Sequence, residues 1–377
     1  MILEEEIISA EGDAQIRKER RALCRKRMME EDLDELLICD PDSIWYLTGI
    51  DVNPMERMMV LQLFAEGTKA PLIYLNRLFA VDEPAIAGEG IRIEWYTDND
   101  SPGELLADRV EGVRIGLDKN LAARFLVPIL TGRTGIQPVI ASFVVDELRA
   151  VKGVQEQDYV RTASRYADET LAETAGWIRI GMTERQISDH LVESFRGKGA
   201  VCGNEFIVSF SENGADAHHL PGSRRLEEGD TILIDTGCRY RRYWSDTSRT
   251  LWCGELTEHR RELYELVKAA NEAAEAAVRP GIALSELDRI ARQMIADAGY
   301  GEYFNHRLGH FIGQEGHEAG DVSASSEIIA APGMIFSIEP GVYLPGEIGI
   351  RIEDLVLVTE DGCEVLNHFP KTPVYVG

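Results

Sequence analysis

Amphipathic helical stretches alternate with short apolar runs along the first part of this 377-residue chain. Charged and apolar positions predict a helix from Arg17 to Glu31 and then a strand at 36–39. Asp40-Pro41-Asp42 is typical of a turn. Further apolar runs predict four strands, at 58–64, 71–75, 91–96 and 113–117. The alternation predicts an α/β amino-terminal domain.

The pattern changes between residues 140 and 158, where Gly153 interrupts a basic helical stretch. A chain of this length exceeds one ordinary core. We therefore expect an amino-terminal domain at 1–145, a linker helix region at 146–157 and a second domain at 158–377. The second domain is predicted to contain four amphipathic helices, at 160–177, 183–198, 257–278 and 284–299.

Two aspartates lie on a predicted hairpin of the second domain. The apolar run 231–234 ends in Asp235, and Asp246 follows eleven positions later at the start of the returning strand. A hairpin can bring the two carboxylates side by side. Acids in the apolar part of a sheet are costly unless they are paired or bind a cation.

Two glutamates repeat this arrangement near the end of the chain. Glu339 ends the apolar run 335–338, and Glu353 lies fourteen positions later in the returning strand. Arg351 is two residues before Glu353, so their side chains share one face of the strand, whereas Asp354 points the other way. Helices followed by an acid-bearing hairpin thus occur twice, which predicts two related halves facing a shared site.

Histidines are concentrated around these hairpins. The segment 306–318 contains His306, His310 and His317, and the loop at 213–219 contains His218 and His219. Four acids with one histidine form an oxygen-rich ligand set that suits two divalent ions, with manganese, cobalt, iron or zinc as candidates. Two ions roughly 3.5–4 Å apart can activate a water molecule at neutral pH, which is hydrolase chemistry.

Composition and charge restrict the partners. The net charge of -26 argues against a nucleic acid, because phosphate binding needs a basic surface. The acidic first six residues do not resemble a secretory signal, and no apolar run approaches the roughly 20 residues that span a bilayer. We expect a cytoplasmic protein with no membrane partner. The six scattered cysteines are expected to be reduced thiols.

With these motifs, the chain resembles the family of creatinase, aminopeptidase P and prolidase, the pita-bread metallopeptidases. The resemblance covers nearly the whole chain and is strongest to bacterial Xaa-Pro dipeptidases, or prolidases. The segment Asp40–Gly49 looks like the amino-terminal signature of that family. It implies an α/β amino-terminal domain followed by an α+β pita-bread catalytic domain with two pseudo-symmetric halves. It also implies a homodimer and a small peptide substrate.

The resemblance implies a role for each candidate residue. Asp246 and Glu353 would bridge two divalent ions, manganese first, with cobalt, zinc or iron as alternatives. Asp235 would complete one ion, and His310 with Glu339 the other. Glu339 would also accept the water proton and pass it to the leaving amine. The remaining candidates would contact substrate, the oxyanion or the metal carboxylates: His218, His317, Arg351 and His306.

The implied activity is hydrolysis of the Xaa-Pro bond in dipeptides by a hydroxide bridging two divalent ions. Two alternatives stay open: a metal-dependent hydrolase or lyase of a non-peptide small molecule, and a non-catalytic peptide-binding module. The complete ligand set argues against the last. Ala217 and Phe311 replace residues usual for the family close to the substrate positions.

Overall fold

The computed structural model describes residues 2–377, with side chains from residue 13 onward. The chain divides into two compact units, Met1–Leu148 and Arg149–Gly377. Within the described residues, none of the helices combines the length and apolar character needed to cross a bilayer.

The first unit is built on one six-stranded mixed sheet with the order β4-β3-β2-β1-β5-β6. Antiparallel pairing joins β1 to β2 and β2 to β3, and the other neighbours are parallel. The strands are β1 (Glu35–Ile38), β2 (Val60–Phe64), β3 (Leu72–Asn76), β4 (Arg92–Tyr96), β5 (Arg114–Leu117) and β6 (Gln137–Ile140). Strands β1 to β3 are buried throughout, as their apolar runs predict.

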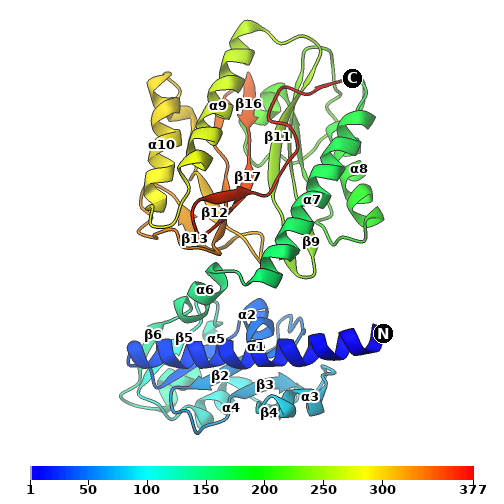
Figure 1. Ribbon diagram of the computed structural model, residues 1–377. Coiled ribbons are helices and arrows are strands. Elements are labelled where there is room, and N and C mark those ends of the chain that lie inside the picture. The colour runs from blue at the N-terminus through cyan, green and yellow to red at the C-terminus, as the bar shows by residue number, and fades with distance from the viewer. Residues whose placement is uncertain (1) are drawn as a thin grey trace. The chain divides into compact units, whose positions relative to one another are not determined.

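Six helices accompany this sheet (Figure 1): α1 (Ile2–Glu30), α2 (Pro41–Thr48), α3 (Glu83–Gly88), α4 (Pro102–Arg109), α5 (Ala123–Gly132) and α6 (Phe143–Ala150). The prediction of a simple turn at Asp40 was wrong, because Asp40 caps α2 by accepting a hydrogen bond from the Ser43 backbone. Pro41 occupies the first helical turn, where its missing N–H costs nothing. The helix α1 begins well before Arg17, where the sequence placed its start.

The second unit contains four long helices in two sequential pairs. The first pair is α7 (Val154–Trp177) and α8 (Glu184–Gly197), and the second is α9 (Glu258–Ala277) and α10 (Leu284–Asp297). Thr183 caps α8 and Thr257 caps α9 through their side chains. In Figure 1 the two pairs flank the strands of this unit on opposite sides, α7 and α8 in green and α9 and α10 in yellow.

Each helix pair packs on its own sheet. The first sheet has the order β19-β11-β8-β7 and the second β13-β12-β14-β17-β18. The first contains β7 (Ile207–Phe210), β8 (Thr231–Thr236), β11 (Thr247–Cys253) and β19 (Tyr375–Val376). The second contains β12 (Gly309–Phe311), β13 (Glu318–Val322), β14 (Ile335–Ile338), β17 (Asp354–Val358) and β18 (Cys363–Val365). Two small hairpins complete the unit: β9 (Arg239–Tyr240) with β10 (Tyr243–Trp244), and β15 (Gly341–Leu344) with β16 (Ile348–Arg351). Short 3-10 turns occur at η1 (Ser211–Ala215) and η2 (Gly301–Tyr303).

The hydrophobic core follows the same division. One cluster joins α7 and α8 to the first sheet through buried side chains that include Leu171, Ile187 and Ile234. Another joins α9 and α10 to the second sheet through side chains that include Val267 and Phe336. The second unit therefore consists of two similar halves, each with a helix pair packed on its own sheet.

Candidate metal centre and active site

The aspartate hairpin forms as the sequence predicts. Strands β8 and β11 pair antiparallel with Asp235 directly opposite Ser248. Asp246 lies two residues before Ser248, on the approach to β11. The two arms run so close that a Cβ on Gly237 would lie 2.0 Å from the Ser245 carbonyl oxygen. Only glycine fits there, and this close approach lets Asp246 stand beside Asp235.

The two glutamates meet through a different pairing from the single hairpin predicted. Strand β14 pairs antiparallel with β17, with Ile338 opposite Asp354, while β15 and β16 form a separate hairpin between them. This register places Glu339 and Glu353 next to each other where the two strands end. A bridge between Ser248 and Glu353 then joins the two halves of the unit.

His310 is oriented by a backbone contact. Its Nδ1 lies 3.1 Å from the Phe311 carbonyl oxygen, which requires the proton on Nδ1 and leaves Nε2 as the free lone pair. That Nε2 faces Glu339 Oε1 at 3.6 Å and Asp246 Oδ2 at 3.8 Å. Such an orienting hydrogen bond is typical of metal-binding histidines.

Arg351 lies against the carboxylates from one side. Its guanidinium donates to Asp235 at 2.6 Å and to Ser248 Oγ at 2.7 Å, and Ser248 in turn donates to Glu353 at 2.7 Å. Arg351 also donates to the Tyr343 hydroxyl at 2.9 Å. Ser248, from β11 in the first half, thus connects Arg351 and Glu353 of the second half.

Of the other histidines near the hairpins, His218, His306 and His317 line the cavity and His219 does not. His218 and His306 line the same cavity as the acids, and His306 Nε2 lies 2.9 Å from the Tyr343 hydroxyl. His317 packs against His310 with ring centres 3.9 Å apart. His219 instead lies 3.0 Å from buried Glu184, which also accepts from Asn213 and so fixes the loop that carries His218.

A cavity of about 670 Å³ opens over these groups. It is lined by Ile207, Ala215, Asp216, Ala217, His218, Asp235, Asp246, Asn305, His306, Arg307, His310, His317, Glu339, Arg351 and Glu353. Its size is in the range of small-molecule sites. Arg307 also contacts the His317 ring at 3.3 Å and forms an ion pair with Asp321.

The crowded acids are electrostatically strained in the absence of a cation. Burial raises the pKa of Asp246, and the neighbouring Asp235 and Glu339 carboxylates raise it further. Burial likewise raises the pKa of Glu353 well above its usual range, and that of Glu339 to about 7. Burial lowers the pKa of His310 to about 3, so its ring is neutral and its lone pair is available.

These residues fit a pair of divalent cations. Ligand atoms lie within 4.8 Å of one another in the trio Asp235, Asp246 and Glu353 and also in the trio His310, Glu339 and Glu353. Glu353 is shared, which indicates adjacent sites. His317 forms a further trio with Asp246 and His310. The four carboxylates together carry up to four negative charges, which match the four positive charges of two divalent cations.

Comparison with known proteins identifies the family. Residues 158–360 match metallopeptidase family M24, and residues 20–151 match the creatinase/prolidase N-terminal domain. The chain belongs to metallopeptidase family M24. An uncharacterized peptidase of Staphylococcus aureus is 33% identical over 345 residues, which is 90% of this chain and 96% of the relative.

Solved structures agree with this assignment. The dipeptidase PepE of Mycobacterium ulcerans is 33% identical, with a TM-score of 0.89 over 97% of this chain and 99% of that one. The prolidase of Pyrococcus horikoshii OT3 is 29% identical, with a TM-score of 0.82 over 94% and 99%. The fold predicted from the sequence, an α/β amino-terminal domain with a pita-bread catalytic domain in two related halves, is confirmed.

Several residues of this M24 peptidase escaped the sequence analysis. Tyr343 connects Arg351 to His306, and Arg307 lines the cavity beside His317. Strand alternation could have indicated Tyr343, because Gly341 pairs with Arg351 in the β15–β16 hairpin and Tyr343 shares a face with Gly341. Arg307 had no such signal.

Proposed function

We propose that this M24 metallopeptidase hydrolyses the Xaa-Pro bond of dipeptides at a binuclear centre of divalent cations. The observation that carries the proposal is the convergence of four carboxylates and the free Nε2 of His310 on one cavity. The similarity over 97% and 94% of this chain to a dipeptidase and a prolidase, respectively, supports the substrate class. We assign Asp235, Asp246, His310, Glu339 and Glu353 as the ligands.

A prolyl amide suits this kind of centre. The peptide nitrogen of proline has no N–H, so an enzyme that must hydrogen-bond that group cannot recognise it. The five assigned ligands would hold two divalent cations, which when bound would supply a water of lowered pKa and polarisation of the scissile carbonyl. Manganese is our first choice of cation, because the oxygen-rich ligand set suits it.

The side chains of the chain supply the proton transfers and the orientation. Glu339 accepts the proton of the attacking water and donates it to the leaving proline nitrogen, while Ser337 Oγ holds this carboxylate at 3.2 Å. His218 and His317 face the cavity as donors for the oxyanion. Arg351 orients the Asp235 carboxylate through its hydrogen bond of 2.6 Å.

Arg307 supports a short substrate. It is a cationic side chain of the cavity lining, one-third exposed and next to His317. We assign it the terminal carboxylate of a dipeptide, because a guanidinium matches the geometry of a carboxylate. A longer peptide would place a neutral amide there instead.

A peptide panel tests the proposal. The metal-depleted protein is reconstituted with Mn, Co, Zn or Fe and incubated with Leu-Pro, Met-Pro, Leu-Ala and Leu-Pro-Ala, with Glu339→Gln as the matched control. Release of proline from the Xaa-Pro dipeptides, absent in the control, supports the proposal. Equal hydrolysis of Leu-Ala would refute the Xaa-Pro preference.

Inactivity on all peptides by a fully metallated protein would favour the second candidate, a non-peptide small-molecule substrate. Ala217 lines the cavity, where its replacement can affect specificity, whereas Phe311 is fully buried against Phe336 in the core and is not among the cavity-lining residues. The homodimer stays a prediction, which light scattering tests.

A further inference from the structure

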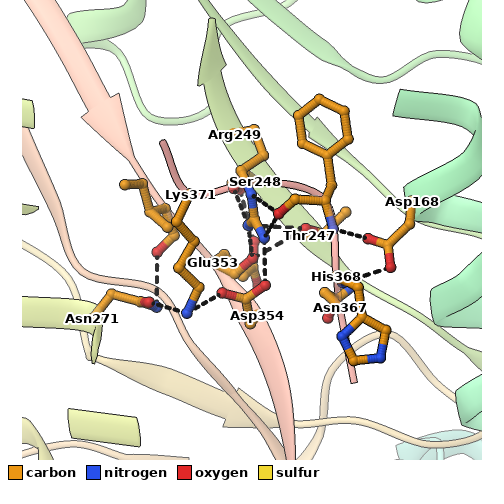
Figure 2. Close-up of polar contacts among 12 residues, drawn as sticks. Asp168, Thr247, Ser248, Arg249, Asn271, Glu353, Asp354, Asn367, His368 and Lys371 are labelled. Atoms are coloured by element: carbon orange, nitrogen blue, oxygen red, sulfur yellow. Dashed lines mark hydrogen bonds and ion pairs between the residues drawn. The ribbon is translucent and has the colours of Figure 1, made fainter. Parts of the chain in front are cut away.

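A buried polar network lies beside Glu353 and contains Arg249, Asn271, Asp354 and Lys371 (Figure 2). Arg249 and Asp354 are both fully buried, and their side chains are 2.6 Å apart. Lys371 Nζ lies 2.8 Å from the other oxygen of Asp354 and 2.6 Å from Glu275. Arg249 and Lys371 therefore each face a buried carboxylate within this network.

Strand geometry explains why the network and the cavity meet at this place. Glu353 and Asp354 are consecutive at the start of β17, so their side chains point to opposite faces. Glu353 faces the cavity, and Asp354 faces the network. The backbone that joins Glu353 to Asp354 therefore belongs both to the cavity and to the network.

Asn271 of α9 connects the network to both glutamates. Its Nδ2 donates to the carbonyl of Ile338 at 2.9 Å and to that of Ile352 at 3.4 Å. Each of these carbonyls belongs to the residue directly before a glutamate, Glu339 or Glu353. The Asn271 side chain is fully buried, and a single amide group therefore spans the two strand ends that carry these glutamates.

The oxygen of the Asn271 amide is also hydrogen-bonded. Asn271 Oδ1 accepts a hydrogen bond from Lys371 Nζ at 2.6 Å, and Figure 2 shows Lys371 directed at both Asn271 and Asp354. The opposite side of the Glu353 peptide is fixed by Arg249, which donates to the Glu353 carbonyl at 2.6 Å. The carbonyls of Ile352 and Glu353, one on each side of the Glu353 Cα, thus both accept hydrogen bonds from buried side chains.

We propose that Asn271, anchored by Lys371, is a positioning residue that sets the spacing of Glu339 and Glu353 and thereby tightens cation binding. The inference rests on the proposed metal centre. Cations bound by two strands need the carboxylates at a fixed separation, and outer contacts that orient ligands typically change metal affinity 10–100-fold. Asn271 itself is not among the cavity-lining residues.

The experiment must separate this role from ordinary stabilisation. Asn271→Leu removes the amide at similar size and leaves two carbonyls without their donor. Val267→Ala is the matched control, because Val267 is also fully buried, lies one turn earlier on the same face of α9 and contacts neither carbonyl through a side-chain donor. Both variants should lower the Tm of the metal-free protein.

Metal affinity is the readout. Titration calorimetry of the metal-free proteins with Mn²⁺ should give a Kd about tenfold or more higher for Asn271→Leu. The Kd for Val267→Ala should equal that of the wild type. Asn271→Asp keeps the oxygen that accepts from Lys371 but loses the donor, so it should also weaken Mn²⁺ binding, and it carries the test if the leucine variant does not fold.

The outcomes are distinct. An unchanged Kd in the Asn271 variants, or an equal rise in Val267→Ala at the same loss of Tm, overturns the positioning role and leaves the proposed function intact. A wild-type protein that binds no Mn²⁺ overturns the metal centre and this inference together.

Discussion

We predict that Glu318, at the start of β13, is a principal electrostatic anchor of the segment between β12 and β13 that contains His317. Its carboxylate is 2.8 Å from Arg149 and 2.9 Å from Lys152, with all three side chains at most 5% exposed. Glu318 also accepts from the Gln314 backbone at 2.9 Å. Replacing it by Gln removes the charge that both buried cations face, at nearly constant shape.

The magnitude follows from the pKa of Glu318. Burial by itself would raise this pKa, but Lys152 and Arg149 outweigh burial and lower it from 4.5 to about 2. A shift of that size corresponds to about 3 kcal/mol of unfolding free energy at neutral pH. Because the folded-state pKa is depressed, the contribution is complete above about pH 4.5 and is lost as the pH falls towards 2.

Urea unfolding of the metal-free protein at pH 7 and pH 3 measures the contribution of Glu318 to the free energy of unfolding. Glu318→Gln should lower the stability of its unit by about 3 kcal/mol at pH 7 and by clearly less at pH 3. Glu315→Gln is the control: Glu315 also pairs with Arg149, at 3.3 Å, but is 44% exposed and should cost less than about 1 kcal/mol. Equal effects of both substitutions, or no effect of Glu318→Gln, would refute the reasoning.

Three further predictions concern the cavity. Glu353→Ala should abolish both metal retention and turnover, because Glu353 belongs to both ligand trios; elemental analysis that finds normal metal content would contradict this. Glu339→Gln should lower kcat about 10²–10⁴-fold while losing much less metal, and equal loss of both would refute its role in proton transfer. His317→Ala should keep the metal and lower kcat/KM about 10²-fold, which steady-state kinetics on a metal-saturated variant measures.

The strand-borne acids could be found from the sequence because their signals are local. Apolar runs ending in Asp235 and Glu339 predicted the buried strands, and antiparallel pairing then placed Asp246 and Glu353 beside them. Resemblance to the family supplied the roles, which the geometry accommodates and experiment has to test.

Other features depended on contacts between distant parts of the chain. Asn271 reaches Ile338 from 67 positions away, and Lys371 reaches Asn271 from 100. No periodicity or spacing encodes such contacts. Asp40 was misjudged for a different reason: an aspartate before proline favours a turn and a helix start equally, and only the hydrogen bond to Ser43 distinguishes them.

The number of cations that the protein binds tests the central claim most directly. Metal-depleted protein is dialysed against Mn²⁺, and the metal bound per chain is measured for the wild type and for Asp246→Ala. The account predicts about two equivalents for the wild type and a loss of both in the variant, since the family resemblance implies that Asp246 would contribute to both ions. Less than one equivalent bound to correctly folded wild-type protein would contradict it.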